Sequence, residues 1–224
     1  MTLNMQAYRP REAVIYPDSD GEPMAENTLQ WEWIATIKGG LDNAFRDDPN
    51  VFVAGDLLWY PVEGDPTIRM APDALVALGR PKGYRGSYIQ FREAGIAPQV
   101  VFEVLSPGNR AGEMARKLQF YERYGVQEYY LFDPDRNTLE GWLREGEALR
   151  AIPHTEGWVS PRLGVRFELA GGSLRILGPD GSPFLSYVDL AIQRDDLARK
   201  TEEDRKRVER LEAQLRALGI EPGA

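Results

Sequence analysis

The chain has 224 residues, a hydrophobic content of 42% and a formal net charge of −8, and its length allows one sizeable core. It contains no cysteine, which excludes disulfides and thiolate metal sites and indicates a reducing cytoplasm. It has one histidine, His154, so a metal ion would have to be held by carboxylates and carbonyls, the ligands of Mg2+ or Mn2+. No secretory signal or bilayer-spanning run is present, which predicts a soluble protein without a membrane partner.

Helix and strand patterns begin after an irregular, polar segment over residues 1–26. The first helix is expected from Asn27, because Asn27 and Gln30 resemble a capping box and apolar residues follow at helical spacing. The expected elements, in chain order, are a helix over 27–45, strands over 51–60, 74–78 and 99–105, a helix over 109–124 and a strand over 128–132. The third strand is β-branched and nearly continuous in apolar residues, as is typical of a buried central strand.

The second half of the chain has a different pattern. A hairpin is expected over 139–152, with its turn at Gly146, and further antiparallel strands over 165–177. This order predicts a mixed-sheet α/β or α+β domain over 27–189. The tail over 190–219 is a charged helix whose heptad spacing permits a homodimer through a short coiled coil or packing on its own body.

Two carboxylates stand out in the first half of the chain. Four Pro-Asp dipeptides occur, and only the one ending at Asp73 leads directly into an apolar strand. Asp73 is therefore either a functional acid or a turn residue at the start of a strand. Glu103 lies within a strand that is apolar on both faces, where a carboxylate is costly unless it is paired, protonated or metal-bound. This favours a functional role for Glu103 over the alternative, an edge strand on which Glu103 faces water.

The net charge of the chain argues against general affinity for nucleic acids, so a DNA-binding protein would need a local basic patch. The segment over 80–92 contains four basic residues and no acidic one, with aromatic residues between them. Residues that could hold DNA phosphates are Arg80, Lys82 and Arg85, with Arg110 at the start of the second helix. A solvated surface loop is the alternative reading of this segment.

Four segments carry a resemblance to a known family. They are Pro72-Asp73 before a strand, VFEVLSP from Val101, RxxExxxKxxxY from Arg110 and GVQEYYLFDP from Gly125. Together they resemble the Uma-type putative restriction endonuclease family, which belongs to the PD-(D/E)xK nuclease superfamily. The resemblance covers roughly residues 27 to 170 and implies a restriction-endonuclease-like core with the order helix, three strands, helix, strand.

The resemblance also implies a set of site residues. Asp73 and Glu103 match the two metal-binding acids, and the carbonyl of Val104 could supply a third ligand to Mg2+ or Mn2+. In the wider superfamily the lysine lies two residues beyond the second acid, where this chain has Leu105. The resemblance places the lysine on the following helix, at Lys117. By spacing alone, Lys117 would instead form an ordinary exposed ion pair with Glu113, worth about 0.3–0.5 kcal/mol.

An acid on the first helix sometimes completes such a site, and Glu26 and Glu32 are the candidates here. The function implied is hydrolysis of DNA phosphodiester bonds by a metal-activated water, with Lys117 steering the water or stabilising the transition state. One alternative is a catalytically inactive nuclease fold that binds DNA or protein and dimerises through its tail. Another is a hydrolase that uses two carboxylates without a metal, such as a glycosidase.

Overall fold

The computed structural model describes residues 14–19, 21, 25–108 and 111–218. Contacts divide the chain into two compact units, Met1–Phe184 and Leu185–Ala224. The first unit holds the sheet and the candidate site, and the second holds the C-terminal helix. Each unit is described by itself.

The first helix, α1 (Thr28–Ala44), begins where the capping residues predict. The side chain of Asn27 accepts a hydrogen bond of 2.8 Å from the backbone N–H of Gln30, which satisfies one of the free amides of the first turn. Ile34, Ile37 and Leu41 recur at helical spacing and are buried against the sheet. The sequence thus determines both the start of α1 and its buried face.

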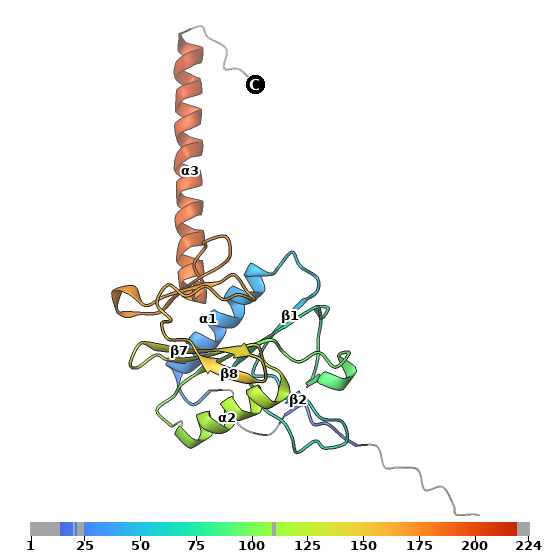
Figure 1. Cartoon of the computed structure of the whole chain (residues 1–224). Helices are drawn as coiled ribbons and strands as arrows, with labels where there is room; N and C mark the ends of the chain where they lie inside the picture. The colour runs from blue at the N-terminus through green and yellow to red at the C-terminus, as the bar shows by residue number, and fades with distance from the viewer. Residues whose placement is uncertain (1–13, 20, 22–24, 109–110, 219–224) are drawn as a thin grey trace, which may run out of the picture. The chain divides into compact units, whose positions relative to one another are not determined.

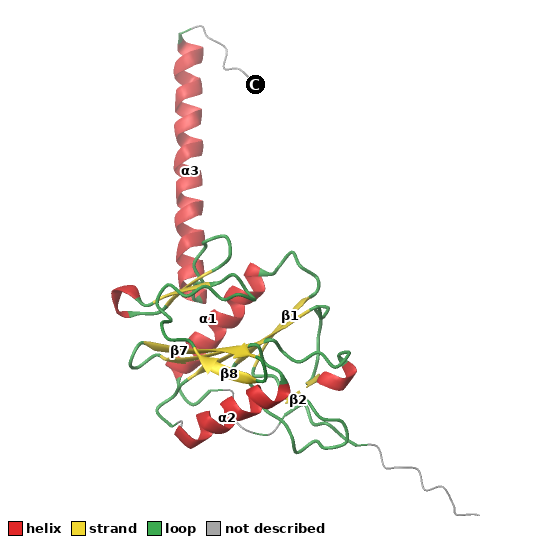
Figure 2. Cartoon of the chain, viewed as in Figure 1, coloured by secondary structure: helices red, strands yellow, loops and turns green. Residues whose placement is uncertain are grey.

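The main sheet has six strands in the order β1-β3-β5-β6-β7-β8. These strands are β1 (Val51–Gly55), β3 (Ala74–Leu78), β5 (Val100–Val104), β6 (Glu128–Asp133), β7 (Thr138–Glu145) and β8 (Ala148–Ala151). Only β5 and β6 are parallel, and the chain crosses between them through α2 (Ala111–Tyr124). The helices α1 and α2 cover opposite faces of this sheet, as Figures 1 and 2 show.

Alternation along β5 gives the sheet two different faces. Phe102 and Val104 pack into the cluster under α1, whereas Val101 packs into the cluster under α2. All five residues of β5 are buried, as the continuous apolar run predicts. By the same alternation Glu103 points to the α2 face, where it is only 2% exposed.

The strand expected over 51–60 is interrupted in the structure. β1 ends at Gly55, and β2 (Trp59–Tyr60) leaves the main sheet to pair in parallel with β4 (Tyr88–Ile89), which is followed by the short helix η1 (Gln90–Arg92). The break lies at Asp56, which has a φ of +45°. A left-handed residue cannot continue the pleat of a strand, so the apolar run is divided in two.

The remaining expected strands are present. β7 and β8 form the hairpin with Gly146 in its turn, at a φ of +61°. β9 (Arg166–Glu168) and β10 (Arg175–Leu177) pair antiparallel on either side of η2 (Ala170–Gly172). The predicted mixed α/β architecture, with helix, strands, helix and strand followed by an antiparallel extension, is therefore confirmed.

The second unit contains α3 (Tyr187–Ala217). The side chain of Ser186 caps it by accepting a 3.1 Å hydrogen bond from the N–H of Asp189. No residue of α3 is buried. None of the helices in the described ranges has the length and apolar content needed to cross a membrane.

Candidate active site

Asp73 and Glu103 come together because β3 and β5 are antiparallel neighbours. Ala74 lies opposite Phe102 in this pair, so Asp73, one residue before β3, lies level with Glu103. Asp73 is 8% exposed, and its Oδ2 accepts a 2.7 Å hydrogen bond from the backbone N–H of Val104. Two acids 30 positions apart in the chain thus share one buried place on the α2 face of the sheet.

Lys117 reaches this pair from α2. Its Nζ donates to Oε2 of Glu103 at 2.7 Å, and its side chain is 15% exposed. The exposed ion pair with Glu113 that the helical spacing permits is not what forms, because Lys117 points to the sheet. The structure therefore brings Asp73, Glu103 and Lys117 into one cluster.

Tyr121, one turn further along α2, holds the other oxygen of Glu103. Its hydroxyl is fully buried and donates a hydrogen bond to Oε1. Burial and the charge of Glu103 raise the pKa of Tyr121 well above its ordinary value, so the hydroxyl remains a donor at neutral pH. Sequence reasoning assigned Tyr121 no role, although its spacing of four from Lys117 places both side chains on one face of a helix.

The electrostatics of the cluster are unbalanced. Burial, and then the charge of Glu103, raises the pKa of Asp73 well above its ordinary value, and Lys117 offsets only part of this effect. Burial alone would lower the pKa of Lys117, but the charges of Glu103 and Asp73 outweigh it and the net shift is upward. Lys117 is therefore an ammonium at neutral pH, beside two acidic groups that compete for one cation.

A second group of contacts joins the start of α1 to the end of β5. Gln30 is 6% exposed, and its Nε2 donates a 2.9 Å hydrogen bond to the carbonyl of Val104. Its Oε1 accepts a 2.8 Å hydrogen bond from the N–H of Glu26, whose carboxylate in turn accepts from the hydroxyl of Ser106. Gln30 thus holds the carbonyl of Val104 in place. The sequence did not predict this contact, because the side chain of a capping-box Gln is expected to bond within its own helix.

The two acids expected on the first helix differ in position, because Glu26 precedes Asn27, the residue that caps α1. Glu26 lies so close to the loop after β5 that a Cβ on Gly108 would collide with its carboxylate. Glu32 is exposed on α1 and has no hydrogen bond or ion pair among the described residues. The structure therefore brings Glu26, but not Glu32, to Ser106 and Gly108 in the loop that follows β5.

The donor atoms in this cluster fit a hard divalent cation. Asp73 and Glu103 provide carboxylate oxygens and Val104 a carbonyl that accepts one hydrogen bond and has a second lone pair. Mg2+ is commonly bound by one or two carboxylates, with waters and substrate phosphate completing its shell. Across residues 14–19, 21, 25–108 and 111–218, no three His, Cys, Asp or Glu side chains are arranged to hold a metal by themselves.

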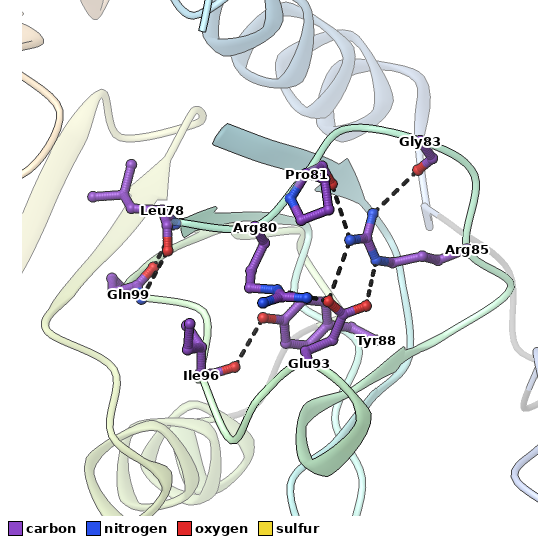
Figure 3. Close-up of polar contacts among 9 residues, drawn as sticks. All are labelled: Leu78, Arg80, Pro81, Gly83, Arg85, Tyr88, Glu93, Ile96 and Gln99. Atoms are coloured by element: carbon purple, nitrogen blue, oxygen red, sulfur yellow. Dashed lines mark hydrogen bonds and ion pairs between the residues drawn. The ribbon is translucent and has the colours of Figure 1, made fainter. Parts of the chain in front are cut away.

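The arginines of the expected DNA-binding loop are engaged inside the protein (Figure 3). Arg80 and Arg85 both donate to Glu93, with Nε–O distances of 2.8 and 2.6 Å, and the Arg85 guanidinium lies 3.9 Å from the ring centroid of Phe52. Hydrogen bonds from Arg85, together with Arg80, lower the pKa of Glu93, so the ion pairs persist at neutral pH.

Two further cations were expected to join this patch. Lys82 donates from Nζ to the carbonyl of Phe45 at 2.6 Å. Arg110 lies outside the described residues. The acid that pairs with both arginines, Glu93, follows directly after the acid-free segment over 80–92.

No curated protein matches the chain. One similar solved structure is the crystal structure of a putative nuclease belonging to DUF820 from Anabaena variabilis ATCC 29413, with 15% sequence identity, a TM-score of 0.45 and coverage of 60% of this chain and 72% of that chain. The model of the Uma2 family, described as putative restriction endonuclease, matches residues 11–170. The match spans most of the chain and agrees with the resemblance of its motifs, and the chain belongs to the Uma2 putative restriction endonuclease family.

Proposed function

We propose that the protein is a divalent-metal-dependent endonuclease that hydrolyses DNA phosphodiester bonds with an activated water. The observation that carries this proposal is the buried cluster of Asp73, Glu103 and Lys117 on adjacent elements. Burying two acids with a single ammonium leaves negative charge that a cation would neutralise. Family membership supports DNA as the substrate.

In this proposal Asp73, Glu103 and the carbonyl of Val104 hold Mg2+ or Mn2+. The bound ion would polarise a phosphate oxygen and lower the pKa of a water ligand. The N–H of Val104 orients Asp73, and Gln30 orients the Val104 carbonyl, so both of these ligands are held in place before any substrate binds. Such preorganisation limits the reorganisation that the reaction requires.

Lys117 supplies the positive charge for the transition state. Its ammonium has three donors, and the structure uses one of them on Glu103, which leaves others for a phosphate oxygen or the attacking water. Tyr121 holds the opposite oxygen of Glu103 and so prevents the carboxylate from turning away. Both donors come from α2, which makes this helix the element that positions Glu103.

DNA contacts in this proposal involve Arg80, Lys82, Arg85 and Arg110. Because Arg80 and Arg85 are paired with Glu93, each would have to share its remaining N–H groups with a phosphate. Loop residues that are already ordered lose less conformational entropy on binding. This smaller loss would offset the weaker attraction of DNA phosphates to arginines whose charge is shared with Glu93.

A second candidate function is a catalytically inactive nuclease fold that binds DNA or protein. The observation that favours it is that both oxygens of Glu103 have internal donors, Lys117 and Tyr121. An acid satisfied in this way is stable without a metal. This function predicts that Asp73→Asn leaves binding intact and that no divalent cation binds at the site.

Plasmid nicking with Mg2+ or Mn2+ tests the proposal. Wild type should be compared with Asp73→Asn and Glu103→Gln, and with Asp135→Asn as a matched control in an exposed Pro-Asp turn. Metal-dependent nicking that disappears in both site variants and persists in the control supports the nuclease. Equal nicking in all four proteins, or nicking insensitive to EDTA, would refute the assignment of these residues. DNA binding by Asp73→Asn without nicking by any of the proteins would favour the inactive module.

A further inference from the structure

The helix α3 has an exposed seam at heptad spacing. Its apolar members Leu190, Leu197, Val208 and Leu211 are each at least half exposed, and Tyr187 extends the row at the start of the helix. A helix of this length gains most of its stability by burying such a stripe against another element. A row with alternating spacings of three and four is the pattern that a partner helix buries.

Two charged residues, Arg194 and Asp204, occupy positions in the same seam. In a parallel, in-register pair of these helices, every seam residue would lie opposite its own copy. Arg194 would then face Arg194, and Asp204 would face Asp204, both in a partly desolvated contact. The parallel arrangement would bury Leu215 as well, but it would also place two pairs of like charges inside the interface.

We propose that α3 pairs antiparallel with α3 of a second copy of the chain, in the register that sets Arg194 against Asp204. The same register sets Leu190 against Val208 and Tyr187 against Leu211. Because the two copies are equivalent, each of these contacts occurs twice. The paired stretch, residues 187–211, is roughly 37 Å long at about 1.5 Å per residue.

The charges select this register among the antiparallel ones. A shift by one heptad in either direction places Arg194 opposite Leu197 or Leu211, and Asp204 opposite Tyr187 or Thr201. Neither residue is locked by contacts within the helix. Arg194 pairs only with its exposed neighbour Asp195, and Asp204 takes part in no ion pair with the described residues. Both are therefore available to a partner of opposite charge.

The absence of cysteine from the chain allows a clean cross-linking test. The full-length variants Leu190→Cys and Val208→Cys are oxidised separately and as an equimolar mixture. The proposed register predicts a mixed disulfide between residues 190 and 208, formed only in the mixture and identified by its mass. Disulfides between identical variants in the separate samples would indicate the parallel pair and overturn the proposal. A monomeric mass with no disulfide would overturn it as well.

Charge exchange gives a second, independent measurement. In the proposed dimer, Asp204→Arg puts two arginines in contact and should weaken dimerisation at least tenfold by sedimentation. The double variant Arg194→Asp with Asp204→Arg should restore the Kd to within about threefold of wild type. In a parallel pair the single variant exchanges one like-charge contact for another, so an unchanged Kd for Asp204→Arg would refute the register. The result does not depend on whether the protein cleaves DNA.

Discussion

The charge imbalance at Asp73 and Glu103 leads to a prediction about stability. Asp73→Asn preserves the shape of the side chain and an oxygen that can accept the Val104 N–H, but it removes the negative charge. Two like charges in close proximity repel by a few kcal/mol at an effective dielectric constant near 20. The attraction of Lys117 offsets part of this repulsion. We therefore expect the metal-free variant to be more stable than wild type by about 1–2 kcal/mol, while losing the proposed activity.

The pH dependence of this difference follows from the raised pKa of Asp73. In the folded protein the group binds its proton more tightly than in the unfolded chain, so wild-type stability falls as the pH rises above the ordinary aspartate value of about 3.9. The decline ends once the pH exceeds the raised folded pKa. Asp73→Asn does not titrate, and its advantage should be absent near pH 3 and largest at neutral or higher pH.

Thermal unfolding in EDTA measures the difference, because 1 kcal/mol corresponds to about 2–4 °C in Tm for a domain of this size. Glu128→Gln is a matched control, since Glu128 is also fully buried but its carboxylate accepts from Tyr130, Ser160 and the N–H of Arg162. An amide cannot accept all three bonds, so this variant should lose about 1–3 kcal/mol. If Asp73→Asn lowered Tm as Glu128→Gln does, the repulsion argument would be wrong.

Further variants test the contacts of Glu103 and of the basic loop. Lys117→Met leaves Glu103 buried without its cation and should cost about 3–5 kcal/mol in EDTA, measured by urea unfolding, with activity abolished. Tyr121→Phe removes one donor to the same carboxylate and should cost about 1–3 kcal/mol, with a smaller loss if Mg2+ is present during unfolding. Glu93→Gln weakens the ion pairs of the loop and should lower the unfolding free energy by about 1–2 kcal/mol at pH 7. Because the pKa of Glu93 is lowered, that loss should vanish as the pH falls through the folded pKa of Glu93, which a pH series of unfolding curves would show.

The fold could be predicted where local patterns agree with tertiary packing. Asn27 marks the start of α1, and the β-branched run of β5 marks the centre of the sheet. Both patterns could be interpreted because a helix cap and a continuous apolar strand are each compatible with few other structures. The interruption at Asp56 could not be predicted. Its positive φ goes with hydrogen bonds from its N–H to the carbonyls of Pro72 and Asp73, which are remote in sequence.

The arrangement of the candidate site could be predicted only in part, for a related reason. The strand context singles out Glu103, since a buried carboxylate requires a partner. It does not identify the partner, and the helical spacing of Lys117 and Glu113 suggests a different pair from the one that forms. Gln30 was missed because it bonds to Val104, which is distant in sequence. Glu93 was missed because it lies just beyond the basic segment over 80–92 whose arginines it binds.

The position of Lys117 on α2 has a consequence for how the candidate site is built. Leu105, at the position where the wider superfamily has its lysine, lines an apolar cavity together with Met114 and Leu131. The ammonium group instead comes from α2, where Lys117 and Tyr121 lie one turn apart and donate hydrogen bonds to the two oxygens of Glu103. The geometry of the acid therefore depends on how α2 packs on the sheet, whereas a lysine on the same strand would be fixed by the backbone itself. Substitutions that loosen α2 should then alter the site without touching any of its residues, which makes the packing of this helix part of the proposed chemistry.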